Sequence, residues 1–277
     1  MSVEEYKMKI NNNLASAKRG NKIAQANVGW AYMKMGLYYD AQIWFKKATS
    51  SLFKKESSSL VNLGYMHEMG YYFKKDLKKA LKYYEQGSNM GSAVGSNNAG
   101  IFHYYGKADP NKKPDYKKAL KYFLLAFERK NYKSCRFLGD IYSLGKGVAK
   151  NSSKAIQYLS KGLSVKDAHC YFRMGWCYDT GTCVSKNYKL ARENYLKAVE
   201  YGKLAGAYSN LGRLYQYGLG VEIDLNKALE YYTKGAELNS PLSKKQLPIV
   251  QKQLQSNNSS NNTSIPDIVM YDECSKD

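Results

Sequence analysis

The chain has 277 residues and a net charge of +20, from 43 basic and 23 acidic residues. It contains no run of 18 apolar residues, which excludes a candidate membrane span, and its polar N-terminal sequence lacks the apolar stretch of a secretory signal. Five irregularly spaced cysteines without such a signal are typical of reduced thiols. We therefore expect a cytoplasmic protein that is not secreted, with access to the nucleus left open.

The first predicted element is a capping helix within residues 1–21. Ser2 followed three residues later by Glu5 is a capping-box pattern, which opens a helix that runs toward Ala17–Gly20. Such a helix shields the exposed side of the first unit of a stacked array.

A glycine then recurs at intervals of 35 to 39 residues, at positions 29, 64, 100, 139, 175 and 212. Apolar residues one before and two after it, and Tyr or His three after it, share one face at helical spacing. Each glycine therefore marks the first helix of a repeat, and self-similarity at this period indicates stacked helix pairs. The predicted repeats cover residues 22–55, 56–91, 92–130, 131–166, 167–203 and 204–240.

The second helix of each repeat is marked by an alanine, at positions 41, 80, 119, 155, 191 and 228. Bulky, mostly aromatic residues follow three and four positions later, and a small residue follows at seven. Glycine inside a helix costs about 1 kcal/mol relative to alanine, so its recurrence predicts a close approach of the second helix at that point.

Caps and turns are predicted between the two helices. Four residues before the second-helix alanine stand suitable N-caps, Asp76, Asp115, Asn151, Asn187 and Asp224, whereas the first repeat has Leu37 there. Six residues after the repeat glycine stand Gly70, Gly106, Gly145, Gly181 and Gly218. These glycines fit helix C-caps with positive φ.

The full pattern, L-G-x-x-Y, then G-x-G-V, then D/N-x-x-K-A-x-x-Y-Y, resembles that of the Sel1-like repeats, relatives of the tetratricopeptide repeats, over about residues 22–240. The first repeat lacks the longer loop and looks like an ordinary tetratricopeptide repeat. The resemblance implies an all-α, right-handed superhelical solenoid of stacked antiparallel helix pairs. It also implies a non-enzymatic scaffold or adaptor that mediates protein–protein interaction.

Two predicted segments follow the repeats. Residues 241–255 can form a C-terminal capping helix, interrupted or bent near Pro248. Residues 256–277 have the composition of a disordered polar and acidic tail.

Histidine and cysteine residues do not form a recognisable metal or catalytic motif. His67 and His103 occupy the recurring tyrosine position, and Cys170, Cys177 and Cys183 occupy small, apolar and loop-glycine positions of the repeat. No C-x-x-C, H-E-x-x-H, phosphate-loop or nucleophile-elbow pattern occurs. We expect no catalytic residue, metal, cofactor or small-molecule substrate.

The candidate site is the inner face of the first helices, where an extended segment of another protein would bind. Asparagines two residues before the repeat glycine would bond a peptide backbone, arginines would attract its carboxylates, and aromatic rings would anchor apolar side chains. The predicted groove residues are Asn27, Trp30, Asn62, Tyr65, Asn98, Arg136, Arg173, Trp176, Asn210 and Arg213.

An alternative partner is a nucleic acid or another anionic surface. Lysines cluster on two second helices, where they would face the convex side: Lys74, Lys75, Lys78, Lys79, Lys82, Lys117, Lys118 and Lys121. Only six of the 43 basic residues are arginine. Because arginine supplies the bidentate and stacking contacts of nucleic-acid recognition, this ratio favours a protein partner.

Overall fold

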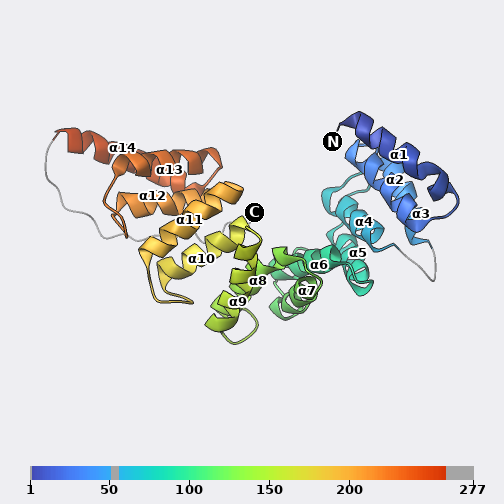
Figure 1. The fold of residues 1–277 in the computed structure, drawn as a ribbon, viewed down its shortest axis with the longest axis horizontal. Coiled ribbons are helices and arrows are strands. Elements are labelled where there is room, and N and C mark those ends of the chain that lie inside the picture. The colour runs from blue at the N-terminus through green and yellow to red at the C-terminus, as the bar shows by residue number, and fades with distance from the viewer. Residues whose placement is uncertain (1, 51–55, 260–277) are drawn as a thin grey trace. The chain divides into compact units, whose positions relative to one another are not determined.

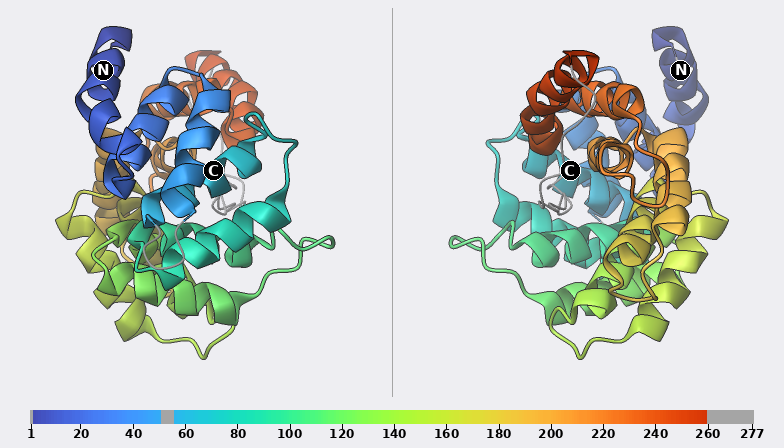
Figure 2. Two further views of the ribbon diagram at one scale, coloured as in Figure 1. Left: turned by 90° about the vertical axis from the view of Figure 1, so that its right-hand side faces the viewer. Right: turned by 90° about the vertical axis from the view of Figure 1, so that its left-hand side faces the viewer.

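The computed structural model describes residues 2–50 and 56–259, and in these ranges every regular element is a helix. The chain divides into two compact units, Met1–Ser134 and Cys135–Asp277. The all-α prediction is confirmed, and the helices pack as stacked pairs within each unit (Figures 1 and 2).

Unit 1 begins with the capping helix and continues with three helix pairs. Its elements are α1 (Val3–Lys18), α2 (Lys22–Lys34), α3 (Tyr38–Thr49), α4 (Ser57–Met69), α5 (Leu77–Asn89), α6 (Ala93–Tyr105), α7 (Tyr116–Glu128) and the short 3₁₀ helix η1 (Tyr132–Ser134). Helix α1 packs on α2, and its predicted capping box forms, with the Ser2 side chain accepting from the Glu5 amide. Each first helix contacts the next, α2 with α4 and α4 with α6.

Unit 2 has three further pairs and a closing helix. Its elements are α8 (Cys135–Leu144), α9 (Ser152–Ser164), α10 (Ala168–Thr180), α11 (Tyr188–Gly202), α12 (Ala205–Gln216), α13 (Leu225–Glu237) and α14 (Pro241–Ser259). Helix α14 packs on α12 and α13. It continues through Pro248 to Ser259, so the predicted interruption does not occur. The tail was predicted to begin at residue 256, but residues 256–259 belong to α14, and the remainder of the predicted tail lies outside the described residues.

The repeat glycines are needed because a bulky side chain of the second helix lies directly against each of them, Leu159 at Gly139 and an aromatic ring at the others. A Cβ at Gly64 would lie 2.8 Å from the Tyr84 ring and 3.1 Å from the Ala80 carbonyl oxygen, and Gly175 has the same relation to Tyr195 and Ala191. Such contacts are far shorter than van der Waals distance. The predicted close approach is therefore confirmed, with the nearest atoms belonging to that side chain.

The predicted caps also form. Each of the five Asp or Asn caps accepts a hydrogen bond from the backbone amide three residues later, whereas Leu37 makes no side-chain cap bond. The five turn glycines all have positive φ, from 61° at Gly106 to 79° at Gly70. Local sequence thus determines where each second helix begins and where the turn before it bends.

Candidate partner-binding surface

The first helices of unit 1 each carry a row of four residues at the same four positions of the repeat. We call this surface the ladder face. It has an asparagine in the middle of each row and mostly apolar side chains around it. Its rows are Ile23, Asn27, Trp30 and Lys34 on α2, Ser58, Asn62, Tyr65 and Met69 on α4, and Val94, Asn98, Ile101 and Tyr105 on α6.

Large apolar side chains on the ladder face reach solvent. Ile23 is 68% exposed, Val94 50%, Met69 47% and Tyr65 38%. Isolated exposed apolar residues are common on proteins, but these recur at matching positions of helices that contact one another. The sequence predicted these positions from the repeat offsets, while naming only Tyr65 among the four.

The three asparagines of the ladder face are half-buried. The Asn27 amide donates to Asn13 Oδ1 at 3.2 Å, and the Asn98 amide hydrogen-bonds to the Tyr84 hydroxyl. An asparagine amide has two donor hydrogens and an acceptor oxygen with two lone pairs. Each of these two side chains therefore keeps hydrogen-bonding capacity beyond the bond that positions it.

The aromatic residues of the ladder face are held by neighbouring rings. Trp30 meets Tyr6 of α1 edge to face at 5.6 Å between centroids, and the Lys9 ammonium lies 4.3 Å from the Trp30 centroid. Tyr65 meets Tyr71 edge to face at 5.8 Å. Trp30 is consequently half-covered by the capping helix, whereas Tyr65 remains open to solvent.

The corresponding residues of unit 2 are engaged in ion pairs between repeats. Arg173 of α10 pairs with Asp140 of α8 at 2.5 Å, and Lys146 Nζ lies 3.0 Å from the other Asp140 oxygen. Asp140 is buried. The sequence interpretation assigned Arg173 to a partner's carboxylate, but a carboxylate of the preceding repeat takes that position.

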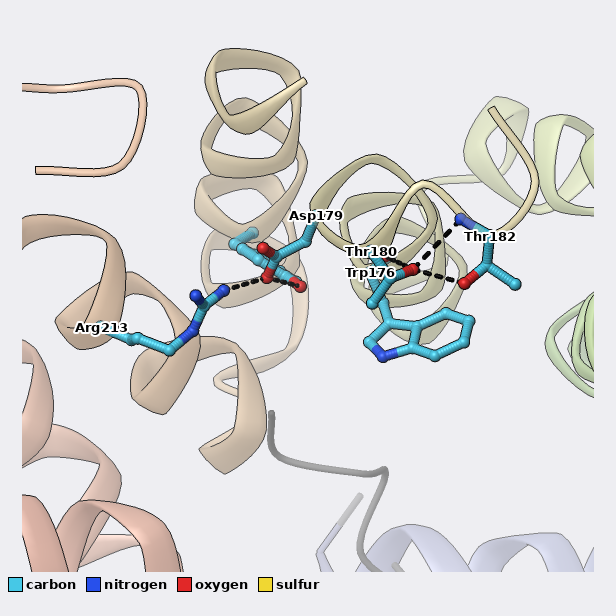
Figure 3. A network of polar contacts seen from close by, with 6 residues as sticks. Trp176, Asp179, Thr180, Thr182 and Arg213 are labelled. Carbon is cyan, nitrogen blue, oxygen red and sulfur yellow. Dashed lines mark hydrogen bonds and ion pairs between the residues drawn. The ribbon is translucent and has the colours of Figure 1, made fainter. Parts of the chain in front are cut away.

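Arg213 repeats this arrangement one repeat later. Its guanidinium pairs with Asp179 of α10, which also accepts a hydrogen bond from the Tyr195 hydroxyl at 3.0 Å (Figure 3). Arg213 is 2% exposed and Asp179 is fully buried. Because a buried charge is costly unless paired, this contact is structural, and the prediction that Arg213 faces a partner is corrected.

The remaining predicted groove residues of unit 2 differ in how accessible they are. Asn210 is fully buried, which corrects its assignment to an open surface. Trp176 is half-buried, with the Arg173 guanidinium 5.7 Å from its centroid. Arg136 is half-buried and lies over Phe137 at 4.6 Å. Phe137 is buried at the position of the unit 1 asparagines.

A recurring hydrogen bond between the two helices of a repeat was missed by the sequence interpretation. Where the ring against the repeat glycine is tyrosine, the residue four after that glycine accepts its hydroxyl: Tyr84 to Glu68 at 2.7 Å, Tyr195 to Asp179 at 3.0 Å and Tyr232 to Gln216 at 2.8 Å. Repeats with Phe45, Phe123 or Leu159 have Met33, Tyr104 or Ser143 there. A polar acceptor thus accompanies tyrosine in three repeats of this chain, and this pairing could have predicted the hydrogen bond from the sequence.

The eight lysines of the alternative site are all exposed, on or beside α5 and α7, and we call them the lysine face. Four of them, with Lys107, line an open hollow of about 720 Å³ between the α4–α5 and α6–α7 turns. Asp76 and Asp109 also line it, so these two carboxylates offset part of the positive charge of the lysines. The structure thus groups lysines 74, 75, 78 and 79 around one hollow.

The histidines pack as members of the repeat. His67 stacks between Phe73 and Tyr83 at 4.2 and 5.6 Å, and burial lowers its pKa. His103 stacks on Tyr122, and its Nε2 lies 2.9 Å from Glu85 Oε1, a hydrogen bond that lowers the pKa of Glu85. Tyr142 and Tyr215 stack in the same way in other repeats, which supports a packing role for both histidines.

Two kinds of feature are absent from the part of the chain that the structure describes. There, no three His, Cys, Asp or Glu side chains gather in a way that would hold a metal ion. Over the same residues, no helix combines the length and the apolar character needed to cross a membrane.

Similar proteins of known structure share the fold. A Sel1 repeat protein from Oxalobacter formigenes is 25% identical and superposes with a TM-score of 0.69, over 83% of this chain and 96% of that one. A protective antigen of uropathogenic Escherichia coli with an SLR fold is 24% identical, with a TM-score of 0.61, over 89% of this chain and 58% of the antigen.

One curated relative is a candidate ERAD-associated E3 ubiquitin-protein ligase component of Schizosaccharomyces pombe, 29% identical over 97 residues. The match spans 35% of this chain and 14% of that protein. A sequence model of the Sel1 repeat matches five segments, residues 57–92, 93–131, 133–164, 168–202 and 205–240. These segments make up more than half of the chain, which therefore belongs to the Sel1 repeat family.

Proposed function

We propose that this protein is a non-enzymatic adaptor that binds an extended segment of a partner protein on the ladder face of unit 1. The observation that carries the proposal is the threefold recurrence of a half-buried asparagine beside exposed apolar side chains. Repeat proteins commonly use such extended surfaces for binding, and the Sel1 family contains scaffolds of this kind.

The spacing of the asparagines suits a peptide in extended conformation. Helices in direct contact lie about 8–10 Å apart, and an extended chain rises about 3.3 Å per residue. Neighbouring asparagines would therefore meet backbone groups about three residues apart. Each amide can donate to a peptide carbonyl and accept from a peptide N–H.

Two of the predicted groove arginines, both in unit 2, change the expected partner. Arg173 and Arg213 already bind carboxylates of the chain itself, so they supply no attraction for an acidic peptide. Ile23, Tyr65, Met69 and Val94 remain available on unit 1. We therefore expect a partner segment that is recognised by its backbone and by apolar side chains.

Selection from a displayed peptide library tests this proposal. Peptides enriched on the wild-type chain should bind the double variant Asn62→Ala/Asn98→Ala about tenfold or more weakly, since each lost hydrogen bond is worth roughly 0.5–1.5 kcal/mol. The matched control is Lys78→Ala/Lys82→Ala, on the second helix α5, which should bind as the wild type does. Equal peptide affinity of the wild type and the asparagine variant would refute the ladder face as the binding site.

A second candidate function uses the lysine face to bind a nucleic acid or another polyanion. The hollow lined by four of its lysines and Lys107 favours this candidate. Binding of a single-stranded oligonucleotide should then weaken steeply with salt and weaken again in Lys78→Ala/Lys82→Ala. Absence of oligonucleotide binding at low salt would exclude it.

A further inference from the structure

Two cysteines meet inside unit 2. Cys177 lies on α10 and Cys183 lies in the turn between α10 and α11, with their Sγ atoms 2.7 Å apart. Both are free thiols, 1% and 8% exposed. Because a disulfide bond is about 2.05 Å long, the sulfurs would have to approach by only about 0.7 Å to bond.

Both cysteines depart from the repeat pattern, and they do so in the same repeat. Cys177 takes the position held by Ala31, Met66, Phe102, Ile141 and Leu214 in the other five. Cys183 takes the position of Gly147 and Gly220, whose φ angles are 71° and 65°. Cys183 is not among the described residues with positive φ, so this turn follows a different path, with Sγ directed at α10.

The surroundings make the two thiols unequal. The hydrogen bond from the Cys177 thiol lowers the pKa of Cys183, with further help from Lys150, the Ser143 hydroxyl and Arg173, while burial opposes the shift. The same hydrogen bond, together with burial, raises the pKa of Cys177. Of the two, Cys183 is therefore the thiol that loses its proton more readily. Disulfide exchange begins with attack by a thiolate.

We propose that Cys177 and Cys183 form an oxidation site, at which a small disulfide such as oxidised glutathione converts them into an intramolecular disulfide. The Cys183 thiolate attacks one sulfur of oxidised glutathione, which breaks that S–S bond and releases one glutathione thiolate. Cys177 gives its proton to that thiolate, and its sulfur attacks Cys183 Sγ in the mixed disulfide. This step releases the second glutathione. Two cysteines are oxidised while one oxidised glutathione is reduced to two glutathiones.

The bond would join the last turns of α10 to the loop that leads into α11. It closes a loop of seven residues, from 177 to 183, and restricts the unfolded chain accordingly. The oxidised protein should therefore melt about 5 °C above the reduced protein.

Mass spectrometry of the full chain tests the proposal without any substitution. The folded, reduced protein is incubated with oxidised glutathione, quenched with acid, denatured, alkylated and digested with trypsin. Trypsin cleaves after Arg173 and after Lys186, which releases a peptide of residues 174–186 that contains Cys177 and Cys183 and no other cysteine. We expect this peptide to lack two hydrogens and to carry no alkyl group, while Cys135 and Cys170 remain alkylated.

Three variants make the result specific. Cys135→Ser/Cys170→Ser should oxidise as the wild type does. Cys177→Ser should stop at the mixed disulfide of Cys183 with glutathione, because the second thiol is missing. Cys183→Ser should leave Cys177 free for alkylation. If peptide 174–186 of the wild type carries two alkyl groups after the incubation, or if Cys135 and Cys170 pair instead, the proposal is wrong.

Discussion

At the scale of single residues, this fold depends on polar side chains buried beside the rings that fill each repeat. Asp179 is fully buried and satisfies both the Tyr195 hydroxyl and the Arg213 guanidinium. Glu68 occupies the equivalent position in unit 1, where it accepts from Tyr84 at 2.7 Å and from Lys107 at 3.2 Å. Its side chain is 21% exposed. The same position therefore carries a buried ion pair in one repeat and a hydrated one in another.

This difference predicts unequal costs for the same substitution. Asp179→Ala should lower the free energy of unfolding by about 3–5 kcal/mol, because Arg213 would be left as a buried charge without its carboxylate. Glu68→Ala should cost about 1–2 kcal/mol, since water can replace the lost acceptor. Urea unfolding followed by circular dichroism measures both. Equal losses would contradict a structural role for the Asp179–Arg213 pair.

At the scale of helices, the second helix of each repeat begins at a side-chain cap, with one exception. Helix α5 has Asp76 as its cap, hydrogen-bonded to the Lys79 amide at 2.9 Å. Helix α3 begins at Leu37, which makes no such bond and is 43% exposed. The start of α3 therefore lacks the hydrogen bond between the cap side chain and a first-turn backbone amide that the other second helices have.

Leu37→Asn should supply the missing cap and raise the free energy of unfolding by about 0.5–1 kcal/mol. Asp76→Ala should have the opposite effect on α5, with a loss of about 1 kcal/mol. Thermal or urea unfolding of the two variants gives both values. A loss of stability in Leu37→Asn would mean that apolar contacts of Leu37 outweigh the cap.

At the scale of the whole molecule, each repeat packs mainly on its neighbours in the chain. In such arrays stability is approximately a sum of local terms, so damage in one repeat stays near it. Helix α14 closes the last repeat of unit 2, where Val250 is fully buried with Tyr215, Ala228 and Tyr232.

Val250→Asp should therefore unfold the end of unit 2 while unit 1 remains intact. We expect amide hydrogen exchange in α12, α13 and α14 to accelerate at least about tenfold, because a buried unpaired charge costs more than the 1.4 kcal/mol that this factor represents. Exchange in α2–α5 should not change. The control is Ile249→Asp, since Ile249 is 42% exposed. Accelerated exchange throughout unit 1 would show that the two units unfold together.

The helix pairs, their caps and the glycine turns could all be predicted from the amino-acid sequence. These features are set by residues within one repeat. The six repeats place residues of the same kind at the same positions, which makes the pattern visible in the sequence. Helical periodicity fixes which positions share a helix face. For this reason the stacking Tyr or His, and the Asp or Asn four residues before the alanine, can be identified by counting along the chain.

Which of the predicted site residues remain available to a partner depends on contacts between repeats, which the sequence pattern does not show. Asn62 and Arg173 both stand two residues before the repeat glycine, yet Asn62 is half-buried on the ladder face while Arg173 is held by Asp140 of the preceding repeat. Cys177 and Cys183 likewise meet because one turn takes a different path. Periodicity tells which face of a helix a residue occupies, whereas its charge partner and its exposure depend on the side chains that the adjacent repeat brings against that face.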